Sequence, residues 1–312
     1  MLVWIIFIAV ILVFLALDLG IFNKEPHIIR TKEATIWTLI WVSIGLSFSL
    51  LIHLFFKNGW IDNPTHLTPS NALIKYITGY LIELSLSMDN IFVIAVIFSS
   101  YAIPPKYQHR VLFWGIIGAI VFRAIMIFFG VALIKKFDWI IYVFGVFLIL
   151  TALKLLISKD KVKFDPKNSM VYRTVRKIIP ITSNVESEKF FIRKKHMLVA
   201  TPLFLVLVII EFTDVIFALD SIPAILAITR DPFIVFSSNI LAILGLRSMY
   251  FFISRISEKF HYIKYSLVAI LTFVGIEFIL QKSYKFADWF SLVFIFGALL
   301  IGILVSIIKK RS

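Results

Sequence analysis

Long apolar segments alternate with short polar segments along the whole chain. The pattern predicts nine helices of about 20 mostly apolar residues or more, the length that crosses the hydrocarbon core of a bilayer. These helices are predicted over residues 2–22, 34–56, 74–98, 111–134, 137–157, 198–228, 233–253, 261–280 and 287–308. Because backbone polar groups in lipid must be hydrogen-bonded internally, we expect an all-α polytopic membrane protein with a single transmembrane domain over residues 1–312.

The long polar segment 158–196 is strongly basic. Within it, the sequence SMVYRTVRKIIPI places apolar residues at helical spacing opposite Arg173, Arg176 and Lys177. This pattern is typical of a short amphipathic helix that lies on the inner leaflet of a membrane. The alternative is a disordered, charged linker.

The distribution of Lys and Arg residues predicts the orientation of the chain. Of the 32 Lys and Arg residues, 22 fall on one side of the predicted spans, 7 on the other and 3 inside spans. By the positive-inside rule, the N-terminus is then outside, and the C-terminus and the basic loop are cytoplasmic. The first apolar segment lacks a basic region before it and contains Asp18, so we expect a retained helix and not a cleaved signal peptide.

The composition excludes several classes of protein. Hydrophobic residues make up 60% of the chain, and there is no cysteine, which excludes disulfides, thiolate metal sites and cysteine nucleophiles. The net charge of +14 is explained by membrane orientation, so we expect no nucleic-acid partner. The sequence shows neither a phosphate-binding glycine loop nor a Ser-His-Asp arrangement. We therefore expect no enzymatic activity and no cofactor.

Acidic residues recur in two of the predicted spans. The stretch IELSLSMDNIFVIAVIF (82–98) resembles IIEFTDVIFALDSIPAIL (209–226). An alignment of the two pairs Glu83 with Asp214 and Asp89 with Asp220. The following spans also match, since VFRAIMIFF contains Arg123 where GLRSMYFFI contains Arg247. The two acidic spans are predicted to cross the membrane in opposite directions. The sequence therefore predicts a 3+3 inverted repeat over 74–157 and 198–280, which is common in secondary transporters.

A regular helix would separate the two acids of each span. Residues Glu83, Ser87 and Asn90 share one face, whereas Asp89 lies about 120° around the helix from Glu83. Convergence of both acids then requires either different neighbouring helices or a break in the helix. Pro223 favours a break in the second acidic span.

The ligand types favour a hard divalent cation. Carboxylate, amide, hydroxyl and backbone oxygens suit Mg²⁺, Ca²⁺ or Mn²⁺, and no sulfur ligand from cysteine is present. Two alternatives use the same acids: structural ion pairs with Arg123 and Arg247, or a proton relay. Glu211 could join either role, and Asp18 lies near the end of the first predicted span.

Several long motifs resemble the TerC/Alx family of integral membrane proteins. They include ALDLGIFNK, GYLIELSLSMDNIFV and IPPKYQHRVLFWGIIGAIVFRAIMI in the first half and TPLFLVLVIIEFTDVIFALDSIPAILAITRDPFIVFSSNILAILGLRSMYF in the second. The resemblance implies a multi-pass protein of the bacterial inner membrane that exports manganese. It also implies a metal pathway formed by Glu83, Asp89, Asn90, Glu211, Asp214, Asp220 and Ser221. One departure is Glu277, which stands where the family pattern leads us to expect lysine.

We therefore predict a secondary transporter that exports Mn²⁺ as its substrate. Proton entry is the reaction that could be coupled to this export. One alternative is a membrane scaffold that recruits partners through the 158–196 loop. Another is the handling of tellurite oxyanions through Arg123 and Arg247, since the family was named for tellurium resistance. The bilayer is an expected partner, and the sequence sets no oligomeric state.

Overall fold

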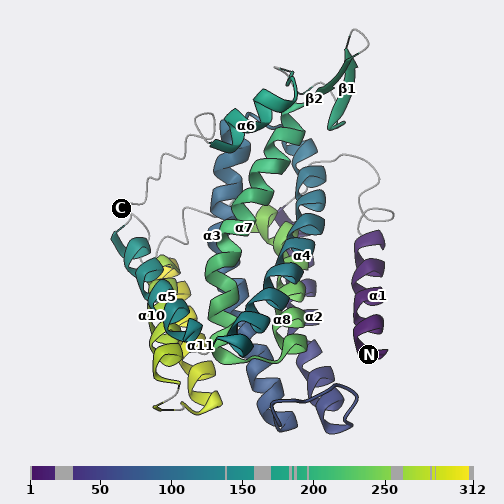
Figure 1. Cartoon of the computed structure of the whole chain (residues 1–312). Helices are drawn as coiled ribbons and strands as arrows, with labels where there is room; N and C mark the ends of the chain where they lie inside the picture. The colour runs from purple at the N-terminus through teal and green to yellow at the C-terminus, as the bar shows by residue number, and fades with distance from the viewer. Residues whose placement is uncertain are drawn as a thin grey trace.

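The computed structural model describes most of the chain as helix (Figure 1). The described residues are 2–17, 31–137, 139–157, 170–182, 185, 188–194, 197–253, 263–281, 283–284 and 286–308. The elements are α1 (Leu2–Leu17), α2 (Thr31–Lys57), α3 (Pro69–Ser100), α4 (Pro105–Lys136), α5 (Ile140–Ile157), α6 (Met170–Ile178), β1 (Phe191–Lys194), β2 (Met197–Ala200), α7 (Pro202–Ile228), α8 (Pro232–Leu244), α9 (Leu246–Ile253), α10 (Ile263–Leu280) and α11 (Asp288–Ile308).

Seven of the described helices are long and apolar enough to cross a bilayer. A further span can be formed by α8 and α9 together, which are bent by 43° where they meet. The first helix, α1, is apolar but shorter than the others. These helices make the chain a multi-pass integral membrane protein.

The span predicted over 233–253 corresponds to α8 and α9, and the helix breaks at Gly245 between them. Gly245 packs against α2, where an added methyl group would lie 3.3 Å from Cβ of Trp41. Glycine adds backbone freedom at this point, which is one recognised cause of a sharp helix bend.

The break that Pro223 favoured is not present in the structure. Pro223 lies inside α7, which continues to Ile228. Helices that cross membranes tolerate proline because neighbouring helices and side chains satisfy the freed backbone groups. The local sequence signal for a break was therefore present in one helix, while the break itself occurs in the next.

The predicted span over 198–228 begins too early. Residues Met197–Ala200 form β2, which pairs antiparallel with β1 in the register Phe191↔Ala200, and α7 begins at Pro202. Proline suits the first turn of a helix because it lacks an N–H that would be unpaired there. The amphipathic helix predicted in the basic loop is confirmed as α6, although residues 158–169 lie outside the described part of the chain.

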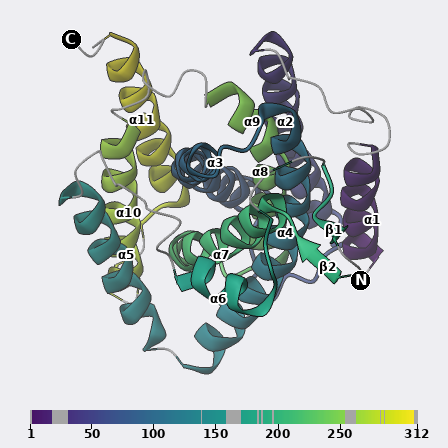
Figure 2. The same ribbon diagram turned by 90° about the horizontal axis from the view of Figure 1, so that it is seen from above.

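The helices form a central group with two flanking groups. Seen from above, α3, α4, α7 and α8 occupy the centre, α5, α10 and α11 stand to one side, and α1 and α2 to the other (Figure 2). The hairpin and α6 lie at one end of the bundle, and the α2–α3 connection lies at the opposite end (Figure 1). The polar side chains described below come mainly from the central group.

A close glycine contact joins α5 to α10. A methyl group on Gly145 would lie 2.9 Å from the carbonyl oxygen of Gly275, and one on Gly275 would lie 2.9 Å from the carbonyl oxygen of Gly145. Small residues of this kind let helix backbones approach closely in membranes. The contact therefore fixes where α5 and α10 cross.

We expect Gly145→Ala to lower the free energy of unfolding by about 1–3 kcal/mol, because the backbone must move to admit the methyl group. Gly297→Ala is the matched control, since among the described residues no atom lies within 4 Å of an added methyl group there. Denaturant unfolding of both variants in detergent checks this. Equal stabilities would contradict the proposed close contact.

Candidate functional site

Arg123 lies at the centre of a buried cluster that joins three helices. Its side chain, on α4, is fully buried and forms ion pairs with Glu83 of α3 and Asp214 of α7. The contact with Asp214 is two-pronged, from Nε to Oδ2 at 3.1 Å and from Nη2 to Oδ1 at 2.9 Å. Nη1 donates to Oε1 of Glu83. The first acid of each duplicated motif therefore faces the same guanidinium group.

Further oxygen atoms surround the Nη1 atom of Arg123. Oγ of Ser221 and Oδ1 of Asn239 each lie 3.3 Å from it. Asn239, on α8, also donates from Nδ2 to Oε2 of Glu83 at 2.8 Å. Together with the ion-paired carboxylates, these groups form what we call the oxygen cage, defined by Glu83, Asp214, Ser221 and Asn239.

Asn239 was missed by the sequence analysis. Its signal was the polar triplet Ser237, Ser238 and Asn239 within the apolar α8, and all three side chains are fully buried. Buried amides require hydrogen-bond partners. A polar triplet in a membrane helix was therefore a usable sign of a polar neighbour.

The oxygen cage has a net negative charge when its ionisable groups are charged. Glu83 and Asp214 together carry two negative charges, and Arg123 supplies one positive charge. The predicted ion pair between these acids and Arg123 is thus present in the structure. One carboxylate charge is left without a balancing charge inside the cage, which favours a further cation or proton.

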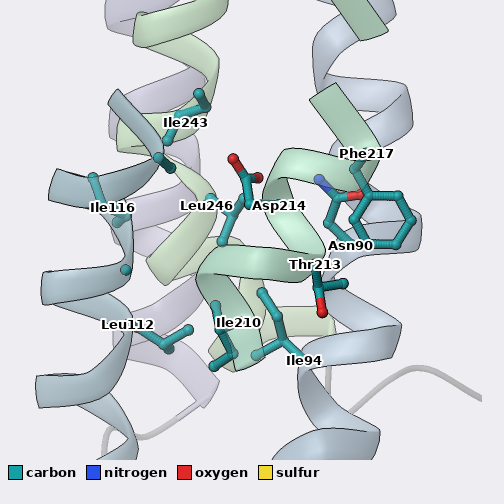
Figure 3. Close-up of a pocket in the computed structure, with 12 residues that line it drawn as sticks. Asn90, Ile94, Leu112, Ile116, Ile210, Thr213, Asp214, Phe217, Ile243 and Leu246 are labelled. Atoms are coloured by element: carbon teal, nitrogen blue, oxygen red, sulfur yellow. The ribbon is translucent and has the colours of Figure 1, made fainter. Parts of the chain in front are cut away.

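A small cavity is also lined by Asp214. It is lined by residues of α3, α4, α7, α8 and α9, among them Asn90, Thr213 and Asp214 (Figure 3). Its volume of about 20 Å³ is enough for a single water molecule or ion. Asn90 is 3% exposed, and its buried Oδ1 has no hydrogen-bond partner among the described residues.

Glu211 lies one helical turn before Asp214 and packs against α4. An added methyl group on Gly118 would overlap its carboxyl group. The Oε2 atom of Glu211 is buried and has no hydrogen-bond partner within the described part of the chain. Gly118 therefore leaves the space that this carboxylate occupies.

Asp89 and Asp220 point away from Arg123, as the helical spacing predicted. Asp220 accepts a hydrogen bond from Oγ1 of Thr151, on α5, at 3.0 Å, and Lys154 acts on it electrostatically. The cation that acts on Asp89 is Lys264 of α10. The second acid of each motif therefore faces the α5–α10 group.

The two arginines of the predicted repeat have different surroundings. Arg247 lies on α9, and its Nη1 is 2.8 Å from Nε2 of His109. The predicted pairing with the acids is thus seen for Arg123, whereas Arg247 contacts a histidine. Asp18, the third predicted coupling residue, lies outside the described residues.

A second polar cavity, of about 500 Å³, lies at the end of the bundle opposite α6. It contains Glu277, which accepts a hydrogen bond from Oγ of Ser291 at 2.8 Å, and the ion pair between Lys75 and Asp288 at 2.7 Å. Lys75 also donates to the carbonyl oxygen of Ile228 at 2.7 Å. These contacts join α11 to α3 and α10, and α3 to α7.

The described residues hold no group of three or more His, Asp or Glu side chains close enough to bind a metal ion. The seven predicted metal-pathway residues are instead divided among the oxygen cage, the small cavity, the Gly118 contact and the α5–α10 interface. These seven residues therefore do not form one ready-made metal site in the described part of the chain.

Comparisons with a family model and with individual proteins point to the same family. The integral membrane protein TerC family matches residues 68–312. The chain is 48% identical to an uncharacterized membrane protein of Myxococcus xanthus, over 99% of this chain and 92% of that protein. It is 42% identical to a protein of Salmonella typhi named putative membrane-bound redox modulator Alx, over 98% of this chain and 94% of that protein. No solved structure gave a significant match.

The family resemblance seen in the motifs around Glu83, Asp89, Asp214 and Asp220 is confirmed by these matches. The chain belongs to the integral membrane protein TerC family.

Proposed function

We propose that this protein is a secondary transporter that exports divalent metal ions, with Mn²⁺ as the main substrate. The observation that carries the proposal is that Asp214 belongs both to the oxygen cage and to a small cavity. It binds Arg123 in the cage, and it lines a mostly apolar cavity of about 20 Å³ together with Asn90, whose buried Oδ1 has no hydrogen-bond partner among the described residues.

The chemistry of these groups supports a hard cation. Carboxylate, amide and hydroxyl oxygens are the preferred ligands of Mn²⁺, Mg²⁺ and Ca²⁺. A cavity for one water-sized particle would require the ion to shed most of its hydration shell, which protein oxygens must replace. Asn90 and Asp214 supply such oxygens, and Thr213 lies beside them. Burial of these groups in a membrane protein points to an ion pathway.

The proposed architecture is nine spans with an inverted repeat of α3–α4–α5 and α7–α8/α9–α10. Helix packing supports it: α4 packs on α7 as α8 packs on α3, and α5 contacts α7 as α10 contacts α3. The pairs α5–α10, α3–α7 and α4–α8 are each their own counterpart when the two repeats are exchanged. Most of the helix contacts are therefore preserved by the exchange, as expected for an inverted pair, whereas α7 packs on α10 more closely than α3 packs on α5.

We propose that the N-terminus is outside, that the C-terminus is cytoplasmic, and that the protein resides in the bacterial inner membrane. The natural absence of cysteine makes this directly testable. A membrane-impermeant thiol reagent should label Thr65→Cys, in the exposed α2–α3 connection, in intact cells. It should label Met197→Cys, at the exposed start of β2, only after permeabilisation. The reverse pattern would overturn the orientation.

The export proposal predicts strong effects at the two acids that face the α5–α10 group. In Mn²⁺-loaded vesicles, Asp89→Asn and Asp220→Asn should each slow export by about tenfold or more, the change that a loss of 1.4 kcal/mol in ion binding produces. Asp62→Asn, at an exposed loop acid, is the matched control and should leave the rate unchanged. Parental rates in both Asp89→Asn and Asp220→Asn would remove these residues from the pathway.

A structural role is the second candidate, because Arg123 satisfies both Glu83 and Asp214 as a buried ion-pair network. In that case the 158–196 loop would carry function by recruiting partners. Scrambling this loop should then abolish function, whereas Asp89→Asn should not. The lack of cysteine excludes thiol–disulfide chemistry as the basis of a redox role in this chain.

A further inference from the structure

The nitrogen atoms of Arg123 occupy a position that resembles a cation site. Nη1 contacts a carboxylate oxygen of Glu83, the hydroxyl oxygen of Ser221 and the amide oxygen of Asn239, which come from α3, α7 and α8. Nε and Nη2 hold both oxygens of Asp214. Two carboxylates, one hydroxyl and one amide form a ligand set typical of hard divalent cations.

We propose that the guanidinium of Arg123 is an internal substitute for the transported cation. It holds the oxygen cage closed in the ion-free state and leaves the cage when a divalent cation binds there. This inference rests on the proposed function. It adds that Asn239 is one of the ligands of the ion and that Arg123 competes with the ion for these ligands.

The electrostatics favour such an exchange. With Arg123 in place, the cage carries one net negative charge, and without it the two carboxylates carry two. A divalent cation would then neutralise the cage fully, whereas the guanidinium neutralises only half of its charge. Because Arg123 and Glu83 are fully buried, an empty cage without Arg123 would be strongly unfavourable. One positive group therefore replaces the other.

The distances also fit a closed, ion-free cage. The Ser221 and Asn239 oxygens lie 3.3 Å from Nη1, whereas oxygen ligands lie about 2.0–2.6 Å from Mg²⁺ or Ca²⁺. A contraction of about 1 Å is within the reach of side-chain rotation. The guanidinium also lies between Glu83 and Asp214 and forms an ion pair with each of them.

The test compares purified wild-type protein with Arg123→Met, using MnCl₂ alone as the probe. Removal of the guanidinium should raise the affinity for Mn²⁺ by at least about tenfold, since a competing charge in direct contact is lost. Mn²⁺ should also raise the melting temperature of Arg123→Met much more than that of the wild type, because a ligand stabilises the state that binds it. Transport by the variant should be lost, because nothing then displaces the bound ion.

A charge-matched variant keeps the test decisive if Arg123→Met aggregates without metal. Arg123→Met/Glu83→Gln retains the net charge of the wild-type cage, and it should still bind Mn²⁺ more tightly than the wild type because the competing group is gone. Affinity equal to or below that of the wild type in this double variant, or no stabilisation of Arg123→Met by Mn²⁺, would overturn the inference.

The result separates the inference from the proposed function. Wild-type Mn²⁺ export combined with no gain in affinity in either variant would leave the function standing and remove the role of Arg123. Tight Mn²⁺ binding by Arg123→Met without any wild-type export would support the cage and remove the transport proposal.

Discussion

Replacement of both carboxylates that bind Arg123 is expected to be far more damaging than either single replacement. Glu83→Gln or Asp214→Asn alone leaves the guanidinium paired with the other acid. Each single change should lower the free energy of unfolding by about 1–3 kcal/mol through lost charge-assisted hydrogen bonds. The double variant leaves a buried, uncompensated positive charge, and should lose about 3–5 kcal/mol beyond the sum of the single effects.

A double-mutant cycle on detergent-purified protein measures this coupling. The control cycle pairs Glu83→Gln with Asp89→Asn, since Asp89 faces Lys264 instead of Arg123 and its change should add to the first without coupling. Simple additivity of Glu83→Gln and Asp214→Asn would show that Arg123 does not depend on the two acids together.

Replacement of Asn90 by leucine is expected to slow export strongly without loss of stability. The Oδ1 atom of Asn90 has no hydrogen-bond partner among the described residues, although the side chain is almost fully buried. An apolar group of similar size should therefore be tolerated or even stabilising, because an unsatisfied buried acceptor is removed. As a cation ligand, the same oxygen is essential, and we expect export to fall by about tenfold or more.

Measurement of both properties on the same Asn90→Leu preparation separates a ligand from a packing residue. Ile94→Leu, one turn along α3 in the wall of the same cavity, is the matched control, and should change neither property strongly. Export at the parental rate by a stable Asn90→Leu protein would exclude Asn90 from the ion pathway.

The membrane class, the main helices and the division of the acids could be predicted from the sequence. Long apolar runs are a strong signal, and a six-residue spacing places Glu83 and Asp89 on different helix faces whatever surrounds them. The separation is seen in their surroundings, since Glu83 forms an ion pair with Arg123 whereas the charge of Lys264 acts on Asp89. Regular helix geometry was therefore enough to predict that the acids of one motif would not meet.

The bend and the full composition of the cage depended on tertiary contacts that the sequence does not show. Pro223 is a stronger local signal for a break than Gly245, yet α7 is continuous and the chain bends at Gly245 beside Trp41. Asn239 joined the cage because α8 packs on α3. Likewise, the repeat alignment equated Arg123 with Arg247, but in the structure Arg123 pairs with Glu83 and Asp214, whereas Arg247 contacts His109.

Mn²⁺ flux through the wild-type protein in proteoliposomes, with and without an imposed pH gradient, is the most direct test of the proposed function. We predict Mn²⁺ movement only in vesicles that contain the protein, acceleration by a proton gradient directed against the metal flux, and slower movement of Mg²⁺ and Ca²⁺. Mn²⁺ movement no faster than in protein-free vesicles, under either condition, would contradict the proposal that this chain is a metal exporter.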